Sequence, residues 1–348
     1  MARPLTMQSI ADAGGVSRMT VSLALRNSPK VSRETCRRLQ ALAAKMGYSP
    51  DPLIQRLTTH LGRVHGKESG QVIAWINAGK ADAIADGGFL PRYECAAVTA
   101  QKYGYRLEEF LLRRPGLTGR KLSQILYQRG IEGLIIGPMP SAGCHLKLDW
   151  DKFSSVAIGY SMLAPQLDRV VNHQLHTGRL AIREILRSGY RRIGLCVSEE
   201  ENRRVDHCWL HAFARYQLQS SVRNRVPPLI QREWSDERFF QWIEKERPDC
   251  VLAHQYWVKD VLERMGKKVP GEVAVAALHW PGPASKVAGV DQRLDVIGAM
   301  AVETLIGQLY RHKKGVPEVP TTIMVEGRWM DGPTIIRKNI KRSAAKAK

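Results

Sequence analysis

The sequence predicts a small all-α head at the N-terminus, followed by a larger α/β domain with doubly wound parallel sheets. The head is predicted from three short, capped helical segments within residues 1–49. Beyond about residue 70, apolar runs of strand length alternate with helical segments, a pattern typical of parallel sheets covered on both faces. The chain of 348 residues is long enough to build both parts.

The head begins with three helices whose ends are marked by capping and breaking residues. Thr6 is a suitable N-cap for a helix that ends at Gly14-Gly15. Ser17 caps a second helix to about Leu25, and Ser32 caps a third. Short helices joined by a turn of about three residues have the layout of a helix-turn-helix unit, whose second helix enters the DNA major groove. A helical bundle without a nucleic-acid role is the alternative.

The charge of the chain favours a polyanionic partner. The formal net charge is +20, from 53 Lys and Arg against 33 Asp and Glu. Residues 1–66 contain ten of the basic residues and three acidic ones, so the head is dense in positive charge. A basic field of this kind attracts phosphate at long range, although charge alone does not identify the polyanion.

The cysteine spacing and the N-terminus favour a cytoplasmic protein. The six cysteines include no C-x-x-C pair, which argues against a zinc site and against a disulfide framework. The N-terminus carries no apolar signal region, and no apolar run approaches the roughly 18 residues of a membrane span. We therefore expect a reducing compartment, no membrane partner, no cofactor and no metal.

The expected elements of the α/β domain carry no catalytic motif. Expected strands lie at residues 72–76, 133–137, 156–159, 192–196 and 250–253, with helices at 94–103, 119–129, 178–188 and 236–246. The P-loop, the GxGxxG fingerprint, HExxH and the GxSxG elbow are missing from the sequence. The sequence thus predicts a protein that is not an enzyme.

The head resembles that of the LacI/GalR (lactose-repressor) family of transcriptional regulators. The residues that carry the resemblance are the run Met7–Ser22, with Gly14 in place of the usual Ala, then Val31-Ser32 and Gly47-Tyr48-x-Pro50. The resemblance implies that Arg18, Met19 and Leu23 face base edges. It places Ser17, Thr20 and Ser22 at phosphates, and Thr6 and Arg26 complete the expected DNA-binding set.

The segment after the head is expected to act as a hinge. Pro50 and Pro52 force an extended exit from the third helix, and residues 50–66 contain a short amphipathic stretch. In the family that this head resembles, the equivalent segment folds on DNA and inserts a leucine into the minor groove. Leu57 falls on that position, where an apolar wedge would bend the duplex. A plain linker is the alternative.

The remainder of the chain resembles the family's sensor domain, which is similar to periplasmic sugar-binding proteins. The stretches that carry this resemblance are residues 178–181, 189–194, 269–275 and 290–292, together with Gly298. It implies an effector-binding and dimerisation domain at residues 67–335 with two lobes. Lobe 1 is expected at about 70–160 and 291–323 and lobe 2 at about 161–290 and 324–335, with crossings near Tyr160, Val290 and Met324. A basic tail occupies residues 336–348.

The expected effector residues depart from the usual sugar-binding pattern. His254 and Gln255 replace a common Asn-Asp pair, and His279 lies where many members have a carboxylate that binds a sugar diol. Arg204 is the nearest match to a common Arg anchor, and Gln292 matches. An imidazole cannot accept two hydrogen bonds as a carboxylate does. Either the effector is different, for which Arg204 and the two histidines favour an anion, or no small molecule binds.

The sequence therefore predicts a homodimeric repressor that binds a near-palindromic double-stranded DNA operator and responds to a small-molecule effector, such as a saccharide or derivative. The alternative is an enzyme-like or non-liganded α/β body fused to a DNA-binding head. A turnover assay on candidate sugars and phosphates separates these readings.

Overall fold

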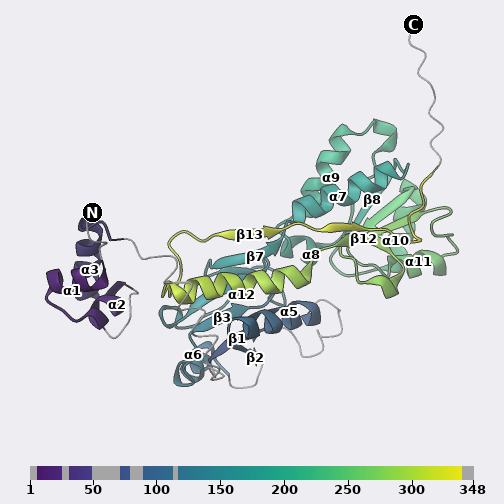
Figure 1. The fold of residues 1–348 in the computed structure, drawn as a ribbon. Coiled ribbons are helices and arrows are strands. Elements are labelled where there is room, and N and C mark those ends of the chain that lie inside the picture. Colours follow the sequence, from purple (N-terminus) through teal and green to yellow (C-terminus); the bar gives the residue numbers. More distant parts are fainter. Residues whose placement is uncertain (1–5, 26–30, 49–70, 79–88, 113–116, 339–348) are drawn as a thin grey trace, which may run out of the picture.

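The computed structural model describes residues 6–25, 31–48, 71–78, 89–112 and 117–338. These residues form a helical head and two α/β lobes, each built on a six-stranded sheet (Figure 1). The predicted fold class, an all-α head before a doubly wound α/β domain, is confirmed. The expected hinge at residues 50–66 and most of the expected tail lie outside the described residues.

The head consists of α1 (Met7–Gly14), α2 (Arg18–Leu25) and α3 (Arg33–Lys45). Each helix begins after a hydroxyl residue whose side-chain oxygen accepts a backbone N–H three residues on, as the sequence predicts. These capping residues are Thr6, Ser17 and Ser32. Gly15, with φ of 64°, ends α1 in the left-handed region that glycine adopts without strain.

The core of the head forms where apolar faces of the three helices meet. Ile10 and Ala11 of α1 pack with Val21 of α2 and Ala43 of α3. The close approach of α3 to the end of α1 also explains why residue 14 is a glycine, because a Cβ at this position would lie 2.8 Å from Leu39 Cδ2. The side chain of Leu39 therefore occupies the space that the methyl group of an alanine at position 14 would need.

The first lobe contains a fully parallel sheet with helices on both faces. Its strands are, in spatial order, β13 (Thr322–Val325), β7 (Asp168–Asn172), β5 (Ser154–Ile158), β3 (Gly133–Ile136), β1 (Val72–Asn77) and β2 (Arg106–Leu111). Helices α5 (Phe89–Lys102) and α12 (Leu294–Tyr310) cover one face, and α6 (Gly119–Gln128) covers the other. A small sheet pairs β4 (Cys144–His145) with β6 (Met162–Ala164).

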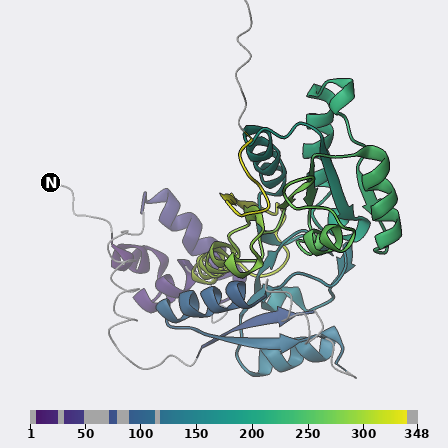
Figure 2. The same ribbon diagram turned by 90° about the vertical axis from the view of Figure 1, so that its right-hand side faces the viewer.

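The second lobe repeats this plan with one antiparallel edge strand. Its order is β14 (Arg328–Met330), β12 (Ala288–Asp291), β11 (Ala274–Ala277), β10 (Cys250–Ala253), β8 (Ile193–Ser198) and β9 (Leu229–Gln231). Helices α7 (Gln174–Arg187) and α9 (Cys208–Gln219) pack on one face, with α10 (Asp236–Glu246) and α11 (Val258–Arg264) on the other. The short α8 (Glu199–Arg204) follows β8. Figure 2 shows the blue first lobe and the green second lobe as two distinct bodies.

The chain crosses between the lobes three times, and one crossing differs in position from the expectation. Strand β7 belongs to the first sheet, so the first crossing follows Asn172 rather than Tyr160. The segment after Tyr160 returns through β6 to pair β7 with β5, which adds a strand that the sequence pattern did not reveal. The second crossing lies between β12 and α12, and the third joins β13 to β14.

A single asparagine links all three crossings. Asn172 Nδ2 donates to the backbone oxygen of Gln292 and to that of Val325, each at 3.1 Å. Thr177 Oγ1 donates to Asn172 Oδ1 at 2.7 Å. A Cβ on Gly327 would lie 2.6 Å from Val290 Cγ1, so the third crossing runs tightly against the second. The lobes are thus joined at one packed and hydrogen-bonded junction.

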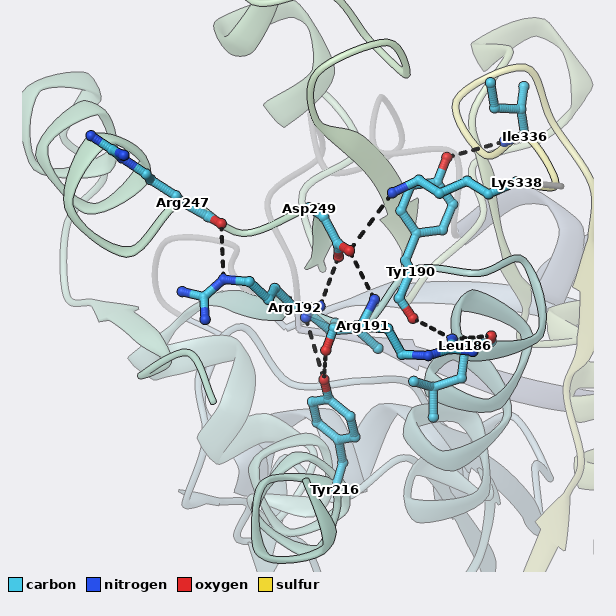
Figure 3. Close-up of polar contacts among 10 residues, drawn as sticks. Leu186, Tyr190, Arg191, Arg192, Tyr216, Arg247, Asp249, Ile336 and Lys338 are labelled. Carbon is cyan, nitrogen blue, oxygen red and sulfur yellow. Dashed lines mark hydrogen bonds and ion pairs between the residues drawn. The ribbon is translucent and has the colours of Figure 1, made fainter. Parts of the chain in front are cut away.

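The last described residues contact the second lobe next to the starts of β8 and β10 (Figure 3). The Asp249 carboxylate, just before β10, accepts the backbone N–H groups of Arg191 and Arg192 at 2.8 and 2.9 Å. Lys338 Nζ lies 3.7 Å from the same carboxylate and 4.1 Å from the centre of the Tyr190 ring. Asp249 thus holds the backbone of Arg191 and Arg192, directly before β8, and the end of the described chain contacts the same carboxylate.

Among the described helices, none combines the length and the apolar character that a bilayer span requires.

The contact between α5 and α12 makes a stability prediction. A Cβ on Gly298 would lie 2.1 Å from the backbone oxygen of Arg92, so Gly298→Ala must push the two helices apart. We expect a loss of about 1–3 kcal/mol in the free energy of unfolding, measured by urea denaturation. Gly307→Ala on the same helix is the matched control, because its Cβ meets only the flexible end of Arg311 at 3.4 Å. Equal losses in the two variants would contradict the close-approach argument.

Candidate functional sites in the head and between the lobes

The second helix of the head presents an exposed N-terminal turn. Arg18 and Met19 are exposed, and Met19 retains 73% of its accessible surface. Neither α1 nor α2 has an acidic residue in its first turn, so their partly positive N-termini remain available to an anion.

The other expected DNA-binding residues lie around this turn. Ser17 Oγ caps α2 by accepting the backbone N–H of Thr20 at 3.0 Å, and it shares a further hydrogen bond of 2.8 Å with Thr20 Oγ1. Each hydroxyl keeps capacity for one more partner. Ser22 and Leu23 are half-buried, while Thr6 is exposed at the start of α1. The predicted contacts at Arg26 and Leu57 fall outside the described residues.

Contacts from α3 fix how α2 is presented. Gln40 Nε2 donates to the backbone oxygen of Ala24 at 3.0 Å, near the end of α2. Arg38 donates to the backbone oxygen of Gly14 at 3.4 Å, at the end of α1. These bonds, with the shared core, hold the turn between α1 and α2 on a rigid base, as a recognition helix requires.

The expected effector residues lie at one edge of the second sheet. His254 follows β10, His279 lies two residues after β11, and Gln292 follows β12, while Arg204 ends the helix after β8. Because these strands are parallel, their carboxyl ends meet at the same edge, where α/β proteins bind ligands. The structure thus brings together residues that are up to about ninety positions apart in the sequence.

We name Arg92, Arg204, His254 and His279 the interlobe cluster. Arg204 Nη1 lies 3.4 Å from Glu201 Oε1, and His254 Nε2 lies 3.9 Å from Glu201 Oε2. The rings of His254 and His279 are 6.2 Å apart between centroids. Arg92 comes from α5 of the first lobe, so the cluster draws on both lobes.

Burial and like charge depress the pKa values of Arg92 and His279. Burial, followed by the charge of Arg204, lowers the pKa of Arg92 to about 10. Burial, followed by His254 and Arg92, lowers the pKa of His279 to about 4, so this imidazole is neutral at pH 7. At neutral pH the guanidinium groups of Arg92 and Arg204 therefore act on each other's surroundings as like charges, and among the described residues Glu201 pairs with Arg204 while Asp291 acts on His279.

Gln292 and Trp209 hold the cluster in place. Gln292 Nε2 donates to the backbone oxygen of Leu278 at 3.0 Å, next to His279, and its Oε1 accepts from Gln174 at 3.2 Å. Gln174 Oε1 in turn accepts the Trp209 indole N–H at 2.8 Å. The Trp209 ring stacks on His254 at 5.0 Å and 25°. Gln292 thus has its polar atoms bonded within the protein, which makes it a positioning residue.

Two buried polar atoms in this region lack hydrogen-bond partners among the described residues. They are Arg92 Nε and Gln255 Oε1. Unsatisfied buried polar atoms are rare in native proteins and often mark a place for a ligand or an ordered water. Sequence reasoning identified Gln255 but missed Arg92, which lies in a helix without any motif and reaches the cluster only through tertiary packing.

A cavity of about 460 Å³ lies at a different place between the lobes. Its lining residues include Tyr160, Met162, Arg169, Arg203, His207 and Thr322. None of the expected effector residues lines this cavity. The interface between the lobes therefore offers two separate polar regions, the interlobe cluster and this cavity.

Comparisons with known proteins agree with this architecture. Residues 6–51 match the model of bacterial regulatory proteins of the lacI family, and residues 182–331 match that of the periplasmic binding protein-like domain. Among curated protein sequences, no relative matches the chain.

Solved structures share the fold of the whole chain. The transcriptional regulator CelR in complex with cellobiose is 16% identical, with a TM-score of 0.60 over 95% of this chain and 100% of its own. The lac repressor dimer bound to operator and the anti-inducer ONPF is 16% identical, with a TM-score of 0.55 over 96% and 100%. A LacI-family regulator from Silicibacter pomeroyi is 21% identical, with a TM-score of 0.50 over 96% and 100%.

The two matched models cover the head and the second lobe in the order that the structure displays, with an exposed recognition turn in the head and polar residues between the lobes. The chain therefore carries a head of the lacI family of bacterial regulatory proteins and a periplasmic binding protein-like domain, the domain combination of a DNA-binding transcriptional regulator.

Proposed function

We propose that the protein is a repressor that binds a near-palindromic operator as a homodimer. The observation that carries this proposal is the exposed turn of α2, where Arg18 and Met19 project from a head held rigid by α3. Two heads related by a two-fold axis would read two half-sites of the same sequence. The lac repressor dimer bound to operator, which shares this fold, supports the arrangement.

Within each head, the contacts divide by chemistry. Arg18 can donate two hydrogen bonds to guanine, while Met19 and Leu23 offer apolar contact to a thymine methyl. Ser17, Thr20 and Ser22, with Thr6 and Arg26, contact phosphates and set the register. Leu57 inserts into the minor groove at the operator centre and bends the duplex. The protein acts in the cytoplasm, where its DNA lies, and performs no catalysis.

The effector in this proposal is a saccharide derivative that carries an acidic group. Saccharides are supported by the structural relatives, one of which holds cellobiose. The acidic group is supported by the interlobe cluster, where burial and the charge of Arg204 lower the pKa of Arg92, and Arg204 itself pairs with Glu201. An anion there would offset the repulsion between the two guanidinium groups, so binding would draw the lobes together through a residue from each.

Base reading by the head is tested by selecting sites from a random duplex pool. We expect a two-fold symmetric site, and we expect Arg18→Ala to lose about 1–3 kcal/mol of discrimination at one base pair of each half-site. Lys45→Ala is the matched control, since it removes one exposed charge from the last turn of α3. A purified protein that prefers no duplex over bulk DNA at moderate salt would overturn the repressor proposal.

The effector class is tested by thermal shift with hexose phosphates, uronic acids and neutral disaccharides. We expect stabilisation by the anionic compounds, and Arg204→Gln should weaken their binding about tenfold or more, as loss of a charged hydrogen bond implies. Arg203→Gln is the control, because this neighbouring arginine lines the separate cavity. If only Arg203→Gln weakened binding, the ligand would have to be assigned to that cavity. If neutral sugars raised the melting temperature as much as the anionic compounds, the proposal of an acidic group would be refuted.

The low pKa of His279 predicts the pH dependence of effector binding. The imidazole is neutral in the free protein because its pKa is about 4, and a bound anion would favour its charged form and raise that pKa. Binding should therefore take up protons in acidic buffer, and affinity should rise as the pH falls toward about 4, the pKa of the free imidazole. Calorimetry in buffers of different ionisation enthalpy measures the uptake. His279→Asn should abolish the uptake, and an affinity that instead falls with decreasing pH would contradict the prediction.

A further inference from the structure

Three side chains with metal-binding atoms meet beside the junction of the lobes, away from the interlobe cluster. His173 precedes α7, His176 lies in the first turn of that helix, and Glu326 lies between β13 and β14. Their candidate ligand atoms all lie within 4.8 Å of one another. His176 Nδ1 is 3.2 Å from Glu326 Oε1, and the centroids of the two imidazole rings are 5.7 Å apart.

Two imidazoles and one carboxylate form a ligand set suited to a borderline divalent metal such as zinc. Such ions bind histidine nitrogen and carboxylate oxygen at about 2.0–2.2 Å, which places tetrahedral ligand atoms roughly 3.3 Å apart. The pair of His176 and Glu326 already has this separation. His173 makes no side-chain cap to α7, so no capping bond opposes the ring rotation that would complete the set.

The backbone around these side chains is fixed in a suitable geometry. The N–H of His173 donates to the backbone oxygen of Val325 at 2.8 Å, directly before Glu326. Asn172 Nδ2 donates to the same oxygen. On the other side of Glu326, Gly327 packs against Val290 so closely that a Cβ would lie 2.6 Å away. The backbone on both sides of Glu326 is therefore held next to the two histidines.

A simple ion pair accounts for only part of this arrangement. The side chains of His176 and Glu326 are 28% and 67% exposed, and an ion pair so accessible to water contributes little to stability. It also gives no role to the second imidazole, which lies against the first at an interplanar angle of 57°. A metal ion would use all three groups and leave one position for water.

We propose that His173, His176 and Glu326 bind one divalent transition-metal ion of the zinc class. His173 and His176 belong to the first crossing and the start of the second lobe, whereas Glu326 belongs to the third crossing. The ion therefore ties two crossings together at the place where the lobes are joined. The ion would bind most tightly to the arrangement of the lobes in which these three groups lie together. It would therefore be a second ligand, besides the effector, whose binding depends on the relative position of the lobes.

Calorimetry of untagged, chelator-treated full-length protein with zinc chloride tests the site. We expect one ion per chain, and His173→Gln/His176→Gln should abolish it. Glu326→Gln, at a side chain that is mostly exposed, should leave the fold intact and weaken binding at least about tenfold, since even losing a residue that only supports a ligand costs that much. His145→Gln/His211→Gln is the matched control, because it removes two exposed imidazoles elsewhere.

Cobalt substitution identifies the ligands independently of affinity. A site of nitrogen and oxygen ligands gives visible bands without the strong near-ultraviolet absorption of a cobalt-thiolate bond, and this is the expected spectrum. A thiolate band would assign the metal to the free cysteines and overturn the proposal. Zinc affinity that is unchanged in the His173→Gln/His176→Gln variant, with circular dichroism verifying its fold, would also overturn it.

Discussion

The arrangement of the two lobes depends on one hydrogen-bonded junction at Asn172. Its amide donates to backbone oxygens on the second and third crossings and accepts from Thr177 on the helix that follows the first. Buried backbone oxygens need hydrogen-bond partners, and the short amide side chain of Asn172 supplies them where β13 ends and where α12 begins. The three backbone links between the lobes are therefore gathered at one residue.

The charged residues of the interlobe cluster also connect the two lobes, because Arg92 lies in the first lobe and Arg204 in the second. Burial and the charge of Arg204 in the second lobe lower the pKa of Arg92 in the first lobe, and burial with the charges of His254 and Arg92 keeps His279 neutral at pH 7. Like charges held close together cost free energy, and the anionic effector proposed above would lower that cost. Gln292, bonded to Leu278 and Gln174, keeps the second lobe's side of the cluster rigid. The coupling of an effector to DNA binding would thus be carried by lobe position.

Local signals in the sequence predicted most of the head. Thr6, Ser17 and Ser32 cap its helices because a hydroxyl can bond a backbone N–H three residues away, an interaction contained within one turn. The strands β1, β3, β8 and β10 were likewise visible as apolar runs. Strand β7 was not visible, because it begins and ends with polar residues, Asp168 and Asn172. These side chains are buried in the fold, where they contact Lys313 and Gln292, which lie far away in the sequence. The first crossing was placed too early for that reason.

The sequence by itself determined the class of the protein and the three helices of the head. These follow from interactions between near neighbours and from the alternation of strands and helices. Only the tertiary structure brought Arg92 to Arg204, or His173 and His176 to Glu326, which is about 150 positions further along the chain. The reason is physical: such encounters depend on how two independently folded sheets are set against each other, and no local pattern encodes that placement.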